Sequence, residues 1–309
     1  MGVSLGRKFV FKMWENHPKT WKLLIDLGVL IKFKTLNNNK ISNKVTLPSS
    51  NIIFVNTNEN RGKALLISNG VTQKRLTNFW SKAVNEYLPD LVLDVGVNYG
   101  ECIFSTNYSN HTKIYGIEAN RDLIKYIQRS REIHPNKAQI KILNVFAADK
   151  EEDKTFYVDK HWSGTSSAAY RPSHGMIEQT TVKSVTIDSI IEEDFTDKTI
   201  LFKVDVEGYE AFALKGMTKL INSSASALGF IEFNSEYMEK SGANINDFLQ
   251  FLNKYFSVYI YDENELISGS RLTLSDLQKR FGSNYIHTDM ILMKNVDKEE
   301  DLVAFFTTL

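Results

Sequence analysis

Two glycines and an acid in LVLDVGVNYG, Leu91–Gly100, are the residues whose types and spacing most clearly permit ligand chemistry. The apolar run before Asp94 predicts a buried strand, and Gly96 and Gly100 predict that it ends in a tight turn leading into a helix. Glycine lets the backbone adopt angles closed to other residues and lets a ligand approach the main chain. The expected helix would add unpaired N–H groups at its start. We therefore predict a nucleotide-type pocket at this turn.

The residues around the glycines indicate which nucleotide such a pocket suits. Pyrophosphate cofactors are normally held by GxGxxG, but here three residues separate Gly96 from Gly100. This spacing disfavours a nicotinamide oxidoreductase. Asp94, at the expected strand tip, would repel a phosphate and attract a cation or an ammonium group. Because S-adenosylmethionine carries an α-amino group and a sulfonium, we expect it to be the cofactor.

A second acid follows at the distance that this pocket requires. KIYGIEAN, Lys113–Asn120, predicts the next strand, which ends near Glu118, 18 residues beyond Gly100. In a βαβ unit, an acid about this far along lies at the tip of the neighbouring strand and accepts hydrogen bonds from a ribose diol. Alternatively, Glu118 is only an acid in the first turn of a helix. Beside the glycine turn, we favour the ribose role.

A third polar segment, FKVDVEGYE at Phe202–Glu210, follows the expected fourth core strand. In a doubly wound sheet, the tips of the first and fourth core strands lie side by side at the edge where ligands bind. Asp205 and Glu207 would then stand beside the mouth of the pocket. Both acids could instead cap the helix expected near Tyr209. Asp205 is the better site candidate because it lies at the strand end.

The elements that must position these residues alternate between strands and helices from residue 91 onward. This order predicts an α/β fold with a mostly parallel sheet covered by helices on both faces. The expected strands are Leu91–Val95, Lys113–Ile117, Ile140–Phe146, Ile200–Val204, Ala227–Phe233, Phe256–Tyr261 and Tyr285–Met293. The expected helices are Arg75–Tyr87, Arg121–Arg131, Tyr209–Ile221 and Asn246–Lys254.

The N-terminal part, residues 1–80, is expected to be a helical and β-hairpin extension of a main domain formed by residues 81–309. Residues 9–33 predict two short helices broken near Pro18. Asn37–Ser50 is polar and predicts a linker. Ile52–Val55 and Lys63–Ile67 flank a polar turn and predict a β-hairpin.

Charge and composition limit the partners and the compartment. The 37 basic and 37 acidic side chains cancel formally, so no overall field would draw the chain to nucleic acid. Residues 1–44, however, hold nine Lys or Arg against two acids. This basic region could contact an anionic membrane surface or a partner, or form a helical cap with a solvated face, which we prefer.

Cys102 is the single cysteine and permits no disulfide within the chain. With no secretory signal and no apolar span long enough for a bilayer, we expect a cytoplasmic protein.

Several motifs together resemble one family. They occur in the order and approximate spacing of the FkbM family of S-adenosylmethionine-dependent methyltransferases over about Leu91–Met293: DVGVNYG, IEAN, VTIDSI, LFKVDVEGYEAFALKGM and GFIEF. The resemblance implies a class I methyltransferase fold, a Rossmann-like sheet with an antiparallel last strand, over residues 81–309. It also implies O-methylation of a hydroxyl, and we expect a saccharide or another small-molecule acceptor. Ala119, where a proline often stands, and the bulky Tyr99 depart from the family pattern.

The motifs predict cofactor-binding residues at several strand ends: Asp94, Gly96, Asn98, Gly100, Glu118, Asn120, Ala147 and Asp205. By resemblance, the first motif surrounds the methionine part of the cofactor and Glu118 binds the ribose. Asp205 belongs to a DxEG motif that borders the transferred methyl group. Ala147, after the third strand, would leave room for the adenine, and Asp149 is either an adenine contact or a solvated charge.

A polar insertion, Asp159–Thr181, lies between the expected third and fourth core strands. Loops of this length inside a domain are usually lids or binding segments. We expect an acceptor lid in which Trp162 or Tyr170 packs against a sugar face, although both aromatic residues could equally anchor the loop. His161 and His174 also lie in this segment.

Methyl transfer from a sulfonium is an in-line displacement, and a sugar hydroxyl needs a base to take its proton. Asp205 is the first choice for this base, and His287 and Glu232 are the other catalytic candidates. Asp205, Glu207 and Glu232 could gather oxygen ligands for magnesium, but we expect no required metal. The alternative function is a catalytically silent, methyltransferase-like binding or scaffold protein. The sequence does not indicate the oligomeric state.

Overall fold

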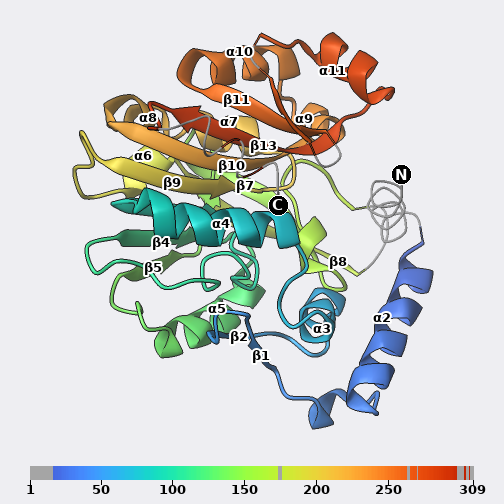
Figure 1. Ribbon diagram of the computed structural model, residues 1–309. Helices are drawn as coiled ribbons and strands as arrows, with labels where there is room; N and C mark the ends of the chain where they lie inside the picture. Colours follow the sequence, from blue (N-terminus) through green and yellow to red (C-terminus); the bar gives the residue numbers. More distant parts are fainter. Residues whose placement is uncertain are drawn as a thin grey trace.

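Strand β3, Leu91–Val95, is buried along its whole length and lies inside an eight-stranded sheet. Val92 belongs to one apolar core, whereas Leu91 and Leu93 belong to another. Because successive side chains of a strand point to opposite faces, layers must cover both faces of this sheet. In the computed structural model the strand order is β12-β11-β13-β10-β9-β3-β4-β5 (Figure 1). The structure describes residues 17–172, 176–262, 265–269, 271–297, 303 and 306.

Five neighbouring strands of the sheet run parallel, and the strands at one side run antiparallel to their neighbours. The parallel strands are β5 (Ile140–Leu143), β4 (Lys113–Ile117), β3, β9 (Thr199–Val204) and β10 (Ser226–Asn234). The remaining strands are β13 (His287–Lys294), β11 (Ser257–Asp262) and β12 (Glu265–Ser268). The predicted mostly parallel sheet with an antiparallel last strand is confirmed, as is the adjacency of β3 and β9.

Helices pack on both faces, as predicted. Helices α4 (Lys74–Tyr87) and α5 (Arg121–Ile133) contribute Phe79 and Ile127 to the core that contains Val92. The opposite core contains side chains of α6 (Ile187–Ile190), α7 (Glu210–Lys215), α8 (Thr218–Ser223), α9 (Ser235–Lys240), α10 (Ile245–Tyr255) and α11 (Leu274–Phe281). The predicted helices over 75–87, 121–131 and 246–254 are confirmed within two residues at each end.

The single helix predicted over Tyr209–Ile221 is wrong, because α7 and α8 are separate. Gly216 lies so close to another segment that a Cβ on it would meet the carbonyl oxygen of Ala148 at 2.0 Å. The Asp188 carboxylate then accepts from the N–H groups of Lys219 and Leu220 at 2.9 and 3.0 Å, which satisfies the start of a new helix.

The predicted third strand, Ile140–Phe146, is also divided. Asn144 donates to the carbonyl oxygens of Glu118 and Ala119 and turns the chain out of the sheet. A second, three-stranded sheet of order β6-β8-β7 follows, formed by β6 (Phe146–Ala147), β7 (Glu152–Asp159) and β8 (Ile177–Val185). The expected long loop over Asp159–Thr181 is therefore wrong at its end, since β8 begins at Ile177. The connection between β7 and β8 includes the 3₁₀ turn η2, Ser163–Thr165.

The glycine turn after β3 does not lead into the predicted helix. Residues 101–106 form turns and bends. A single i→i+4 bond joins the Phe104 N–H to the Gly100 carbonyl, and the N–H groups on either side bond elsewhere. The Ile103 N–H, for example, donates to the Asp94 carboxylate at 3.1 Å. The acid at the strand tip thus binds the returning chain and competes with helix formation.

The predicted hairpin has the wrong second strand. β2 (Ile52–Phe54) pairs with β1 (Lys44–Thr46), which lies in the expected linker, and residues 63–67 belong to helix α3 (Asn60–Ile67). Short apolar runs do not separate strand from helix, and Glu59 begins this helix by accepting from the Arg61 and Gly62 N–H groups. A further 3₁₀ turn, η1, spans Asn38–Lys40.

Helix α2, Pro18–Phe33, lies at one side of the molecule next to α3 (Figure 1). It begins at Pro18, as the predicted break indicates, while the first of the two predicted helices and residues 1–16 of the basic region lie outside the described residues. Among the described helices, none combines the length and apolar composition that crossing a membrane requires. The predicted division at residue 80 stays a prediction.

Candidate functional site

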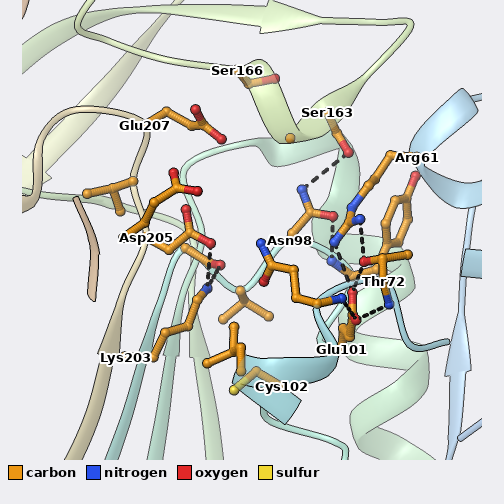
Figure 2. A pocket seen from close by; sticks show the side chains of 18 of the residues that line it. Arg61, Thr72, Asn98, Glu101, Cys102, Ser163, Ser166, Lys203, Asp205 and Glu207 are labelled. Atoms are coloured by element: carbon orange, nitrogen blue, oxygen red, sulfur yellow. Dashed lines mark hydrogen bonds and ion pairs between the residues drawn. The ribbon is translucent and has the colours of Figure 1, made fainter. Parts of the chain in front are cut away.

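A cavity of about 750 Å³ opens at the carboxyl ends of the parallel strands. Its floor comes from the segments after β3, β4, β5 and β9, and its far wall from β10 and β13. The N-terminal part closes another side with residues of α2, α3 and the segment before α4. Figure 2 shows the two sides: Lys203, Asp205 and Glu207 lie opposite Arg61, Thr72 and Glu101.

The turn after β3 is held open by its backbone. Gly96 has φ +84° and Asn98 φ +52°, a region that favours glycine. A Cβ on Gly96 would lie 1.9 Å from the carbonyl oxygen of Asp205, so no larger residue fits between these two strand ends. The predicted close approach at Gly96 is therefore made by the neighbouring strand's own backbone, and both Gly96 and Asn98 line the cavity.

Glu118 connects the ends of β3 and β4. Its two carboxylate oxygens accept from the N–H groups of Asn98 and Asn120, both at 2.7 Å. Burial raises its pKa, and these N–H groups oppose that shift. Glu118 still lines the cavity, and carboxylate oxygens have further lone pairs for a hydroxyl donor. Its position thus permits the predicted contact with a ribose.

Lys203 is a buried cation between two strand-end acids. Its Nζ lies 3.2 Å from Asp94 Oδ1 and 3.7 Å from Asp205 Oδ2, and it donates to the carbonyl oxygen of Gly96. Burial alone would lower the pKa of Lys203, but the charges of Asp94 and Asp205 outweigh burial and raise it. Lys203 therefore stays protonated and fixes both acids relative to the glycine turn.

Three predicted cofactor residues do not line the cavity. Asp94 is fully buried and has Lys203 as its cation, so it supports the turn from behind. Asn120 caps α5 by accepting from the Asp122 N–H at 3.1 Å. Gly100 has φ +86°, and a Cβ on it would lie 2.3 Å from the Phe104 ring. Ala147 does line the cavity, whereas Asp149 does not.

Three carboxylates gather where the floor after β9 meets the far wall at β10. Oxygens of Asp205, Glu207 and Glu232 all lie within 4.8 Å of one another. Burial and the charge of Glu232 raise the pKa of Asp205 to about 6, against the lowering effect of Lys203. Oxygen ligands in this arrangement suit a hard divalent cation. Our expectation that no metal is required stays a prediction.

His287 lies on the same wall because β13 runs antiparallel to β10. That direction places the first residue of β13 beside the last residues of β10, where Asn234 pairs in register with His287. His287 Nε2 lies 2.9 Å from Glu232 Oε1. The structure thus brings together all three predicted catalytic candidates, Asp205, Glu232 and His287, on one cavity wall.

The segment between β7 and β8 covers part of the cavity. Of its described residues that were singled out from the sequence, only Trp162 lines the cavity. Trp162 lines the cavity and packs edge-on against Trp21 with ring centroids 5.8 Å apart. Tyr170 stacks instead on Tyr237, at 4.5 Å, and does not line the cavity. His161 is likewise outside the lining, and His174 lies outside the described residues.

Sequence reasoning missed the N-terminal wall. Arg61 pairs with Glu101 at 2.9 Å, and Glu101 also accepts from the N–H groups of Thr72 and Gln73. Arg75 pairs with Asp289 of β13 at 3.3 Å. No motif marks these residues, because their partners lie 28 to 214 positions away in the chain.

The lining suits a cationic nucleoside with a polar tail. The three carboxylates form an acidic wall that a sulfonium or an ammonium would complement. Glu118 can accept from a ribose, and the apolar side chains of Phe146, Ala147 and Phe156 border the region where an adenine would lie. The residues therefore fit S-adenosylmethionine.

Residues 94–259, more than half of the chain, match the model of the methyltransferase FkbM domain. A search of curated proteins gave no match. Among solved structures, a methyltransferase FkbM from Methylobacillus flagellatus KT has 14% identity and a TM-score of 0.39, over 75% of this chain and 54% of that one. This chain therefore spans about half of that protein.

Two other solved structures are similar to the chain. A SAM-dependent O-methyltransferase from Thermotoga maritima has 10% identity and a TM-score of 0.38, over 74% of this chain and 68% of that one. StiE O-MT, residues 961–1257, has 11% identity and a TM-score of 0.41, over 80% of this chain and 81% of that one. With the motifs, the sheet order and the family match over residues 94–259, the chain belongs to the FkbM family of methyltransferases.

Proposed function

We propose that the protein is an S-adenosylmethionine-dependent O-methyltransferase whose acceptor is a hydroxyl of a saccharide or glycan. One observation carries this proposal. A single cavity joins the turn at Gly96 and Glu118 to a wall that holds Asp205, Glu232 and His287. A binding region for a methyl donor thus lies next to groups that can take a proton.

The cofactor, when bound, would supply a methyl group on a positively charged sulfur. Gly96, Asn98, Glu118 and Ala147 would hold it, since these predicted residues line the cavity. Asp94, Gly100 and Asn120 would act indirectly, by fixing the turn and the end of β4. Holding the acceptor oxygen in line with the methyl carbon would provide much of the catalysis.

Asp205 is our first choice for the base that takes the hydroxyl proton. With a pKa raised to about 6, Asp205 is ionised at neutral pH yet more basic than an ordinary aspartate. Lys203, at 3.7 Å, stabilises its charged form and fixes its position. His287 and Glu232, joined at 2.9 Å, are a second acid–base pair on the same wall.

The saccharide assignment is supported by the lining on the N-terminal side. Trp21 and Trp162 offer aromatic surface, and Gln73 offers a side-chain amide for hydrogen bonding. A sugar presents apolar C–H faces and hydroxylated edges, so a wall that combines both types of residue suits it.

The decisive experiment is incubation with S-adenosylmethionine carrying a labelled methyl group and a panel of saccharides, followed by mass spectrometry of the methylated product. We expect a label on one hydroxyl. Asp205→Asn should lower turnover by roughly 10²- to 10⁴-fold while calorimetry still detects cofactor binding. Full turnover by this variant would place the base elsewhere, at His287 or Glu232.

The same experiment tests the alternative of a silent binding or scaffold protein. Cofactor binding without turnover on any acceptor would favour it. A parallel reaction with a chelator tests the metal: activity that survives would argue against a required cation at the three carboxylates.

A further inference from the structure

The outer face of α2 exposes an unusual amount of apolar surface. Leu23, Leu27 and Ile31 are 67%, 50% and 62% exposed, and Leu24 and Leu30 are 45% and 42% exposed. Six of the ten large apolar side chains with high exposure among the described residues lie between positions 23 and 36. Scattered exposed leucines need no explanation, but a contiguous group marks an interaction surface.

These side chains form one stripe along the helix. At about 100° per residue, Leu23, Leu27, Leu30 and Ile31 fall within a sector of about 120°. The opposite side of the same helix contains the buried Ile25 and Val29. Since that side already packs against the protein, the stripe faces away from the body, at the edge where Figure 1 shows α2 (blue).

The charges around the stripe are positive. Lys19 and Lys22 lie near its start, and Lys34 follows its end, all of them exposed. The one acid of α2, Asp26, is paired with both Lys22 and Lys63, at 2.5 and 2.8 Å. Asp26 therefore offsets Lys22 but leaves the charges of Lys19 and Lys34 at the two ends of the stripe.

We propose that the outer face of α2, Leu23, Leu24, Leu27, Leu30 and Ile31 with Lys19 and Lys34, binds an anionic lipid bilayer surface. A helix with leucines on one side and lysines beside them lies in the plane of the interface, where its apolar stripe enters the acyl boundary and its lysines meet anionic headgroups. A second copy of the chain is a poorer occupant, because antiparallel packing of two such helices would bring their lysines together. This proposal does not depend on the proposed function.

The test is co-sedimentation of the full chain with vesicles of phosphatidylcholine mixed with phosphatidylserine, and with vesicles of phosphatidylcholine alone. The protein should bind the mixed vesicles, less at high salt, and bind the neutral vesicles much more weakly. Leu27→Glu/Ile31→Glu should lower binding to the mixed vesicles by roughly tenfold or more. Lys19→Gln/Lys34→Gln should lower it less and reduce the salt dependence.

Ile133→Glu is the matched control, because Ile133 is 51% exposed at the end of α5 and should bind vesicles as the unaltered protein does. Circular dichroism and cofactor calorimetry should be unchanged in all variants, since none of the altered residues lines the cavity. Equal binding by the unaltered protein and Leu27→Glu/Ile31→Glu would overturn the proposal. Two other results would also overturn it. A dimer that this variant dissociates would identify a second copy of the chain as the occupant of the stripe. Vesicle binding that appears only after removal of residues 1–16 would identify that segment as the occupant.

Discussion

Asp205 shows how the surroundings of one side chain set its chemistry. Burial and the Glu232 charge favour its neutral form, and Lys203 favours its charged form. The net result is a pKa of about 6, so Asp205 loses its proton at a higher pH than an exposed aspartate does. A base must be ionised to act, so its working range lies above this value.

We therefore expect kcat/KM to fall as the pH is lowered through about 6. Glu232→Gln removes a charge that raises the pKa of Asp205, so the acidic limb of the profile should move to lower pH. The measurement is kcat/KM between weakly acidic and neutral pH for both proteins. An acidic limb that stays in place in Glu232→Gln would assign it to a group other than Asp205.

Glu210 affects stability rather than chemistry. It is 1% exposed, its Oε1 accepts from the Val206 and Gly208 N–H groups, and its Oε2 has no hydrogen-bond partner among the described residues. Burial raises its pKa to about 8, against the lowering effect of the Val206 N–H. The folded state thus retains a proton that the unfolded state releases near pH 4.5.

The consequence is a stability that depends on pH. The contribution of Glu210 is complete below about 4.5 and is lost as the pH rises to about 8. Glu210→Gln, which cannot ionise, should gain stability relative to the unaltered protein over this window, by up to about 5 kcal/mol. Urea unfolding of both proteins at several pH values measures this difference. A difference that does not change with pH would contradict the assignment.

Asp94 shows what sequence reasoning could not resolve at this scale. Its position at the end of the first core strand was predicted, and so was the glycine turn after it. Its partner was not, because Lys203 is 109 residues away and only the parallel pairing of β3 with β9 brings Asp94 and Lys203 into register. The motif predicts where the acid lies, but the role of the acid depends on which cation the fold places beside it.

At the scale of elements, the pair between β3 and β9 is the main electrostatic link of the site. Lys203 and Asp94 are 4% and 0% exposed. Removing one partner of a buried pair leaves the other charge without compensation. Lys203→Met should therefore lower the free energy of unfolding by about 3–5 kcal/mol.

A double variant separates this effect from lost packing. Lys203→Met/Asp94→Asn removes both charges and should recover part of the lost stability in urea unfolding. Lys113→Met, at the exposed start of β4, is the control and should change stability by less than about 0.5 kcal/mol. If the double variant is as unstable as the sum of the two single ones, the ion pair does not provide the link.

The strands of the parallel sheet could be predicted because their apolar runs are long and end at glycines or acids. The bounds of β3 and β4 were confirmed to the residue. Two of the errors share a cause, a side chain that redirects the chain by bonding its backbone. Asn144 at the end of β5 donates to the Glu118 carbonyl, 26 residues away, and Glu59 accepts from the Arg61 and Gly62 N–H groups at the start of α3. Sequence periodicity contains no signal of such bonds.

The segment between β7 and β8 was predicted to be an acceptor lid, and its anchors extend to several elements. The Ser163 N–H donates to Glu59 at 2.6 Å, and the Asn60 N–H donates to the His161 carbonyl at 3.0 Å. Asn98 Nδ2 donates to Ser163 Oγ at 3.3 Å. These bonds join the segment to both α3 and the glycine turn, and they hold Trp162 at the cavity.

Trp162→Ala should therefore raise the KM for the acceptor by roughly tenfold or more, because it removes aromatic surface from the cavity wall. Tyr170→Ala is the matched control from the same segment, since Tyr170 packs on Tyr237 outside the lining. Steady-state kinetics with the acceptor that the saccharide panel yields measures both. Unchanged acceptor affinity in Trp162→Ala would remove the idea of an acceptor lid.

At the scale of the whole molecule, the cavity unites residues that are far apart in the chain. Its lining begins with Trp21 and ends with Asp289. The core continues across the same span, since Val29 and Val45 belong to the cluster that contains Val92 and Ile291. A ligand in this cavity therefore stabilises the folded molecule as a whole, and cofactor binding can be measured as resistance to unfolding.

S-Adenosylmethionine at about 100 times its dissociation constant would stabilise the folded state by about 2.7 kcal/mol. For a chain of 309 residues this amounts to a rise in Tm of roughly 4 °C, and the demethylated product should act similarly.

Glu118→Gln keeps the shape of the side chain but makes it a weaker acceptor for a ribose hydroxyl. The variant should therefore bind S-adenosylmethionine roughly tenfold or more weakly, and the rise in Tm on adding the cofactor should be smaller. Glu192→Gln makes the same chemical change on an exposed side chain and should keep the full shift. A nicotinamide dinucleotide that raised Tm as much would contradict the assignment, because this glycine turn lacks the phosphate-binding spacing.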